Sequence, residues 1–336
     1  MSADIALIIG NGFSIGFNKF HKMSKYDDTQ NPTKWPVMEK GSKNLLIDAL
    51  PRMKQFFSQW PELDDFDIFK KAVGIYDSTK PGTLYFDRVK GVEKDEVLLT
   101  EDFLKDIIPL ECRHFLCLAF SAYSLDTKIK MQKAWPWYAW LRAHRSRIST
   151  ICSYNYDLII EQALQRMGRS YFNESGVFKF GAIPLYKPHG SCQYESIGIS
   201  MPVAYPLNSY INDFDSQIKE LREDQYLMPR IVPFCVIPNQ LNIYSHFGAM
   251  TIQEKIFNKK LNSVKYCVII GHSYSDADKP EIDIALSQLP NGATVIIANP
   301  HPPEDLIQKV LSMNLEVACW KSLNGPVNEN DELIML

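Results

Sequence analysis

The apolar positions of the chain form short continuous runs that alternate with amphipathic stretches. The first run, Ile5–Ile9, ends at two closely spaced glycines, Gly10 and Gly12, which is typical of a buried parallel strand that leads into a tight turn. Later runs predict strands at 149–153, 231–236, 266–271 and 294–298, and amphipathic stretches predict helices at 158–167, 251–261 and 280–289. This alternation predicts an α/β fold, a Rossmann-like parallel sheet with covering helices.

The region between the first two predicted strands departs from that alternation. Residues 43–57 and 101–123 repeat apolar side chains at helical intervals, and Pro51 and Pro109 are expected to kink or break these helices. We therefore expect residues 19–147 to form a large helical insertion lobe in a Rossmann-like domain made of residues 1–18 and 148–336. The aromatic cluster at 135–140 is expected to pack in the core rather than to stack on bases.

A second irregular and polar stretch occupies residues 193–228. We expect it to form a flap or a second small insertion, with one helix at 214–221. Since the chain contains no low-complexity linker, both insertions are expected to be lobes around one sheet rather than independent domains.

Composition and charge exclude several classes of protein. The chain has 336 residues, of which 46% are apolar and 22% charged, so it can bury a large core. The net charge of -3 provides no general basic field, so no direct nucleic-acid binding is expected. The apolar run near the N-terminus is too short to cross a membrane and has no basic segment before it. A cytoplasmic protein without a membrane segment is therefore expected.

The cysteines indicate neither a disulfide framework nor a zinc module. There are seven of them, scattered along the chain, and none forms a C-x-x-C pair. This pattern is typical of reduced thiols and gives no support to a four-cysteine zinc site. No metal is expected.

Polar residues follow several of the predicted strands and are candidates for a site. The turn from Gly10 to Ser14 leaves the first strand, and its glycines would let backbone N–H groups approach a pyrophosphate. The alternative is a tight turn that needs glycine without any ligand, and Gly16 comes one residue late for a G-x-G-x-x-G pattern.

The next strand leads into Asn155 and Asp157, which places both at the carboxyl edge of the sheet, where open parallel sheets bind ligands. Asp157 alone is equally well explained as a cap of the following helix. His189 stands between Pro188 and Gly190, and this glycine would let another molecule come close; a structural role is the alternative.

Two further strand ends carry Gly271 with Ser273, and Asn299. Ser273 can donate to a phosphate or ribose hydroxyl, and Asn299 can bind a ribose. Either side chain can equally satisfy its own turn by bonding to nearby backbone.

The order of these motifs resembles that of the sirtuin-like (silent information regulator two-like) family. The resemblance covers about residues 1–18 and 148–305 and implies NAD as the ligand. Gly10, Gly12 and Ser14 match the phosphate-binding turn of the family, with Asn11 and Phe13 counted in the same cofactor-binding turn. The other matches are Asn155 and Asp157 in the nicotinamide-ribose motif, His189 as the catalytic histidine, and Gly271, Ser273 and Asn299 on the adenosine side.

Two departures from the family pattern decide between its branches. Protein deacylases carry an Ile-Pro-Asp-Phe-Arg type of loop after the glycine turn, whereas this chain has Ile-Gly-Phe-Asn-Lys at 15–19, and it lacks the zinc module. The pattern resembles the bacterial antiphage-defence branch, which implies hydrolysis of NAD to ADP-ribose and nicotinamide and depletion of NAD in infected cells.

The resemblance also implies roles for the matched residues. Asn155 would hold the ribose hydroxyls or the attacking water, His189 would act as general base, and Asp157 would orient the loop. An NAD-dependent protein deacylase and a non-catalytic NAD or ADP-ribose sensor remain the alternatives. A dehydrogenase is least favoured, because no second strand with an acidic ribose ligand follows the glycine turn.

An unregulated NAD hydrolase would kill its host, so a layer of control is expected. The candidates are a homo-oligomer, a regulatory partner protein of a defence system, and a closed flap. The surfaces expected to mediate this control are the helical insertion and residues 193–228.

Overall fold

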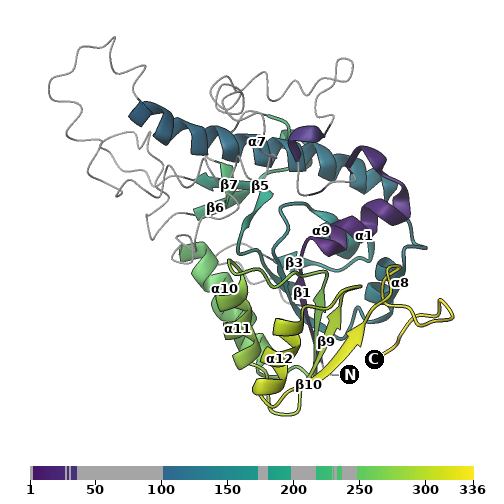
Figure 1. The fold of residues 1–336 in the computed structure, drawn as a ribbon. Coiled ribbons are helices and arrows are strands. Elements are labelled where there is room, and N and C mark those ends of the chain that lie inside the picture. The colour runs from purple at the N-terminus through teal and green to yellow at the C-terminus, as the bar shows by residue number, and fades with distance from the viewer. Residues whose placement is uncertain are drawn as a thin grey trace, which may run out of the picture.

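The computed structural model describes residues 3–26, 29, 32–35, 101–172, 181–197, 217–228, 230, 233–236 and 248–336. Its centre is a seven-stranded sheet in the order β10-β9-β8-β1-β2-β4-β3 (Figure 1), and every neighbouring pair is parallel. The strands are β1 Ile5–Ile9, β2 Ile148–Ser153, β3 Tyr171–Phe172, β4 Ile183–Tyr186, β8 Tyr266–Ile270, β9 Thr294–Ala298 and β10 Glu316–Trp320. The predicted α/β, Rossmann-like fold is confirmed.

Strand β1 shows why the sequence folds in this way. It pairs with β2 on one side and β8 on the other, and all five of its residues are buried. Ile5, Leu7 and Ile9 enter one hydrophobic core, while Ala6 and Ile8 enter a second core across the sheet. Successive side chains of a strand point to opposite faces, so a strand covered on both faces needs a continuous aliphatic run.

Helices cover both faces of this sheet (Figure 1). The core that contains Ile5 also takes side chains from α1, α7, α8 and α9, and the core that contains Ala6 takes side chains from α10, α11 and α12. The α-helices are α1 Gly12–His21, α7 Glu101–Lys130, α8 Pro136–Ala143, α9 Ile159–Arg166, α10 Gly248–Leu261, α11 Lys279–Ser287 and α12 Glu304–Ser312. Short 3-10 helices are η1 Ser24–Tyr26, η2 Pro32–Lys34 and η3 Glu223–Gln225.

Two sequence predictions about the second region of β-structure were wrong. A strand does form within 231–236, as β7, Pro233–Cys235, but it was expected in the parallel sheet and instead belongs to a separate antiparallel sheet in the order β6-β5-β7 with β5 Gly190–Ile197. The helix predicted at 214–221 is contradicted by β6, Gln217–Glu220, which pairs antiparallel with β5. In β6 the buried Ile218 is followed by the exposed Lys219, and pairing with β5 outweighs the local helical spacing.

The helical prediction between the first two strands held in part. Helix α7 continues through Pro109, so the proline does not break it; packing of α7 on β5 and β7 outweighs the one backbone bond that proline removes. The predicted helix at 43–57 lies outside the described residues. The aromatic cluster is core as predicted, since Trp135, Trp137 and Trp140 are each at most 6% exposed.

No helix in the described part of the chain contains an apolar stretch long enough to span a membrane.

Candidate functional site

A cavity of about 800 Å³ opens at the carboxyl edge of the large sheet. From β1 the chain builds the sheet in one direction through β2, β4 and β3, and later in the other direction through β8, β9 and β10. The switch point therefore lies between β1 and β8, which is where open parallel sheets bind ligands. Nine of the eleven residues predicted from sequence line this cavity: Gly10, Asn11, Gly12, Asn155, Asp157, His189, Gly271, Ser273 and Asn299.

The glycines of the first turn are explained by packing between two strand ends. A Cβ on Gly12 would lie 2.6 Å from the Cα of Gly271, and a Cβ on Gly10 would lie 2.8 Å from the Gly271 oxygen. The Gly12 N–H donates to the Gly271 oxygen at 2.8 Å, and Gly271 has a φ of 58°, in the left-handed region that favours glycine. The turns after β1 and β8 thus touch through their backbones.

The N–H groups of Gly10, Gly12, Phe13 and Ser14 in this turn already have acceptors within the chain. Phe13 N–H donates to the Gly10 oxygen at 3.1 Å, and Ser14 N–H donates to the Asn11 oxygen at 3.0 Å. The tight-packing alternative therefore accounts for the glycines, and pyrophosphate contact at this turn stays a prediction.

Substitution of Gly12 by alanine is expected to lower the free energy of unfolding. The added methyl group would overlap the Gly271 backbone, and overpacking of this kind costs about 1–3 kcal/mol. Urea denaturation measures the effect, with Gly16→Ala as the matched control. Gly16 lies in the same helix with nothing within 4 Å of its Cβ position, so its substitution is expected to be neutral or stabilising by up to about 1 kcal/mol. Equal losses in both variants would contradict the packing explanation.

Phe13 and Ser14 were predicted to contact a cofactor, and neither lines the cavity. Phe13 is 1% exposed, and its ring packs on Trp135 with centroids 4.9 Å apart. Ser14 is also 1% exposed, and its hydroxyl donates to the Asp157 carboxylate at 2.5 Å. The first helical turn of α1 directs these two side chains toward the protein interior, so their contribution is to hold the turn and the loop after β2.

Asn155 is held in a defined orientation at the wall of the cavity. Its Nδ2 donates to the Gly10 oxygen at 3.1 Å and to the Ser14 hydroxyl at 3.0 Å. A carbonyl oxygen can only accept, so this contact fixes which end of the amide faces β1. No described residue donates to Oδ1, so this acceptor is available to a ligand in the cavity.

Both carboxylate oxygens of Asp157 accept hydrogen bonds from within the protein. Oδ2 accepts from Ser14, and Oδ1 accepts from the Ile159 N–H at 3.0 Å, at the start of α9. The N-cap of α9 is Leu158 rather than Asp157, but Asp157 accepts from the first N–H of the helix, so it has the structural role that the alternative expected. Burial raises the pKa of this carboxyl, while the Lys187 charge and the two hydrogen bonds oppose that rise.

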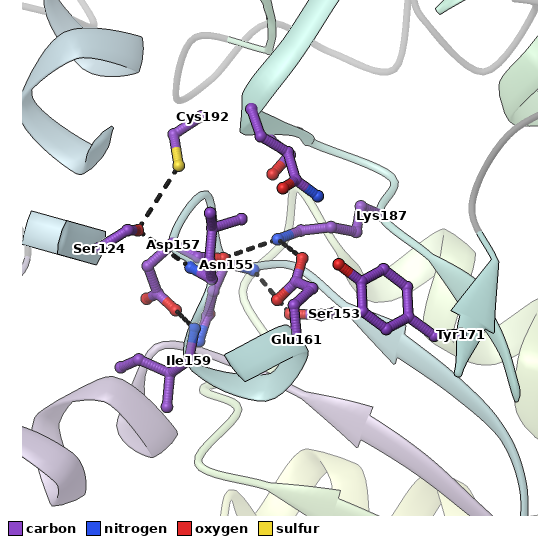
Figure 2. Close-up of polar contacts among 12 residues, drawn as sticks. Ser124, Ser153, Asn155, Asp157, Ile159, Glu161, Tyr171, Lys187 and Cys192 are labelled. Atoms are coloured by element: carbon purple, nitrogen blue, oxygen red, sulfur yellow. Dashed lines mark hydrogen bonds and ion pairs between the residues drawn. The ribbon is translucent and has the colours of Figure 1, made fainter. Parts of the chain in front are cut away.

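A buried ion pair between Lys187 and Glu161 stabilises the loop after β2 (Figure 2). Lys187 is fully buried, and its ammonium donates to the Asp157 main-chain oxygen and to the Glu161 carboxylate, both at 2.7 Å. Ser124 of α7 contributes from another side, since its hydroxyl accepts from the Leu158 N–H at 3.2 Å. The chain segment that carries Asn155 is thus attached to β1, α7 and the strand end at Lys187.

His189 lies across the cavity beside a carboxylate. Its side chain is 24% exposed, and its Nε2 lies 3.3 Å from Oδ1 of Asp278, next to the start of α11. The other oxygen, Oδ2, lies 3.4 Å from Nε2 of His272 and accepts from the Ser275 hydroxyl at 2.8 Å. Asp278 therefore stands between two histidines.

The two histidines have opposite electrostatic environments. Burial disfavours the charged form of His189, but the Asp278 carboxylate outweighs it and raises the pKa of His189 above its usual value. Burial lowers the pKa of His272 to about 4. His272 Nδ1 accepts from the Tyr274 N–H at 2.8 Å, so its proton sits on Nε2, facing Asp278.

Gly190 was expected to let another molecule approach His189. The structure gives a different reason for a glycine at this position. Its φ is 75°, and a Cβ here would lie 2.4 Å from the Phe234 oxygen of β7. The close neighbour that the glycine admits is a strand of the same chain.

The adenosine-side candidates differ from each other. Asn299 is used for local structure: Nδ2 donates to the His272 oxygen at 3.1 Å, and Oδ1 accepts from the His301 N–H at 2.9 Å. Ser273 is exposed in the cavity wall, and no described residue bonds to its hydroxyl. Hydrogen bonds to its own turn account for Asn299. Contact with a ligand remains a prediction for Asn299 and for Ser273.

Sequence reasoning missed Asp278 and His272 as site residues. Both belong to the polar run after β8, and the available signal was two ionisable residues in a loop at the carboxyl edge of the sheet. Among the described residues, no group of three or more His, Cys, Asp or Glu side chains has the geometry of a metal site.

Comparison with known proteins identifies similar folds only at low identity. No family model matches the chain, and no curated protein matches it. A solved structure of a Sir2 enzyme has 14% identity and a TM-score of 0.35, with 96% of this chain and 89% of that chain covered. A Sir2 complex with a p53 peptide and NAD+ has 12% identity and a TM-score of 0.31, with 96% and 89% covered. A likeness at these values says nothing about the chemistry of this chain. The chemical argument rests on the residues of the site.

Proposed function

We propose that the chain is an NAD+ glycohydrolase that cleaves the bond between nicotinamide and ribose. The observation that carries the proposal is the convergence of Asn155 and His189 on one cavity at the switch point of a parallel sheet. Ligand cavities in proteins commonly measure about 300–1,000 Å³, and this one falls in that range. The motif order that resembles the sirtuin-like family supports NAD as the substrate.

The reaction separates the sugar from a leaving group. The bond between C1′ of the ribose and the nicotinamide nitrogen breaks, and its electron pair stays with nicotinamide. Positive, oxocarbenium-like charge builds on the ribose, and the oxygen of water then bonds to C1′. The products are ADP-ribose, nicotinamide and one proton.

Each proposed role uses an atom with a defined position. Asn155 Oδ1 accepts a hydrogen bond from a ribose hydroxyl or from the attacking water, so that much of the rate comes from orientation. His189 accepts the proton that the water or hydroxyl loses. Asp157 orients the loop through Ser14 and Ile159, and direct contact with the ribose is the lesser role. Gly271, Ser273 and Asn299 are proposed for the adenosine side.

The test is chromatography of the nucleotides after the purified chain is incubated with NAD+. The proposal expects ADP-ribose and nicotinamide in equal amounts, formed by the unmodified chain and not by His189→Ala. Since activity is expected to be controlled, the incubation is repeated with a lysate of phage-infected cells. Binding of NAD+ without product in every condition would replace the proposal with the sensor alternative. Product that required an acylated peptide, with stoichiometric zinc, would replace it with the deacylase alternative.

We further propose that the activity depletes NAD in antiphage defence and is restrained by a control layer. The predicted insertion at 19–147 and the predicted flap at 193–228 are the proposed surfaces for self-association or for a partner protein. Size-exclusion fractions assayed separately test this proposal. Full activity of a monomer without any partner or trigger would leave the control layer without support.

A further inference from the structure

In the cavity wall, His189 pairs with Asp278, a residue that is not among those matched to the sirtuin-like family. Nε2 of His189 lies 3.3 Å from Oδ1 of Asp278, and Oδ2 of the same carboxylate accepts from Ser275 and lies 3.4 Å from His272. Asp278 is 9% exposed, so solvent screens its interaction with His189 only weakly. The contact is a charge pair without hydrogen-bond geometry, and a carboxylate at this distance stabilises the protonated form of the imidazole.

We infer that Asp278 is the positioning residue for His189, because its carboxylate lies 3.3 Å from Nε2 and pairs with the protonated ring. This inference rests on the proposed function for the identity of the substrate. The proton removed from the attacking water goes to the unprotonated ring nitrogen of His189, and the imidazolium that forms is paired with Asp278. The carboxylate itself stays ionised through the step.

His272 completes the arrangement without competing for the proton. Its Nδ1 is occupied by the Tyr274 N–H, so its Nε2–H faces the second oxygen of Asp278. Because burial lowers the pKa of His272 to about 4, it stays neutral over the range in which His189 titrates. The two oxygens of Asp278 thus face one neutral histidine and one titrating histidine.

The other groups around His189 are few within the described residues. Glu281 of α11 adds a second negative charge that favours the imidazolium. The rings of Tyr154 and Tyr156, from the loop after β2, lie 5.1 and 6.4 Å from the imidazole centroid. Tyr156 is tied to the Val236 oxygen, and burial raises the pKa values of both tyrosines well above their usual range. Asp278 is the charged group in direct contact.

The first arm of the test reads His189 itself and needs no turnover. Histidine ring signals are followed by NMR titration in the full chain and in Asp278→Asn, with His189→Gln used to assign the signal. A carboxylate at this distance shifts a neighbouring pKa by about 1–3 units. We therefore expect the His189 midpoint above the usual histidine value in the unmodified chain and lower by about one unit or more in Asp278→Asn. An unchanged midpoint would overturn the inference.

The second arm reads the reaction. A base must be deprotonated, so kcat/KM is expected to rise with pH through a midpoint that matches the NMR value. In Asp278→Asn that midpoint moves to lower pH, and kcat falls by about 10-fold or more because orientation is lost. The control is Asp283→Asn in α11, the helix that follows Asp278; Asp283 binds Tyr274 and Lys309, and its substitution should leave both midpoints unchanged.

The two arms separate the two claims. If the unmodified chain shows no cleavage of NAD+ but its His189 titration shifts as expected, the proposed function fails and the pairing stands. If cleavage occurs and neither midpoint moves in Asp278→Asn, the function stands and the positioning role fails.

Discussion

Asn155→Ala is expected to lower the rate of NAD+ cleavage by about 100-fold or more. The substitution removes Oδ1, an acceptor to which no described residue donates, and removes the Nδ2 bonds to Gly10 and Ser14. Two buried hydrogen bonds contribute about 1–3 kcal/mol together, which is a modest part of the stability of a folded domain. The variant should therefore stay folded and lose turnover.

The measurement is product formation by chromatography, accompanied by thermal unfolding of the same sample. Asn262→Ala is the matched control, because this asparagine is exposed beyond the end of α10 and its loss should change neither quantity. A folded Asn155→Ala chain that hydrolyses NAD+ at the unmodified rate would remove Asn155 from the mechanism.

Lys187→Met is expected to lower the free energy of unfolding by about 3–5 kcal/mol. Lys187 and Glu161 are 0% and 1% exposed and pair at 2.7 Å. Removal of the ammonium leaves a buried carboxylate without its counter-charge and also frees the Asp157 main-chain oxygen from its donor. Removal of one partner of a buried pair costs far more than replacement of both.

Urea denaturation of the unmodified chain, the single variant and a double variant tests this expectation. Lys187→Met combined with Glu161→Gln should be more stable than Lys187→Met alone, because the uncompensated charge is gone. Burial raises the pKa of Glu161, and loss of Lys187 removes an opposing charge, so Glu161 would be protonated over a wider range in the folded state. A group whose pKa is raised on folding supports the folded state below its unfolded pKa and less as the pH rises. The deficit of Lys187→Met should therefore be smaller at pH 4 than at pH 8, and a pH-independent deficit would contradict this account.

The predictions from sequence succeeded where one strong pattern determined the result. The aliphatic run at Ile5–Ile9 admits little except a strand buried on both faces, and β8 and β9 follow from similar runs. The predictions failed where the structure of a segment depends on which strand it pairs with. The short runs at β6 and β7 do not reveal which sheet they join. The edge strand β10 was not predicted, although four of its five residues are apolar.

The candidate site shows the same division. Position at the end of a strand was enough to bring Asn155, His189 and Gly271 to one cavity, because parallel strands share their carboxyl edge. The direction of a side chain was not available in this way. Ser14 turns inward to Asp157 and Asn299 is used in its own turn, and the contact between His189 and Asp278 joins segments far apart in sequence.

The backbone contact between Gly12 and Gly271 affects how a large mutational screen of this protein should be interpreted. Each glycine excludes a methyl group on the other, so nearly every amino acid at either position should score as loss of function. A screen that selects only on activity would rank both positions with ligand-binding residues, although steric exclusion alone is enough to cause the loss. Parallel selection for protein abundance would separate the two classes: Gly12 and Gly271 should be depleted in both selections, and Asn155 and His189 mainly in the activity selection.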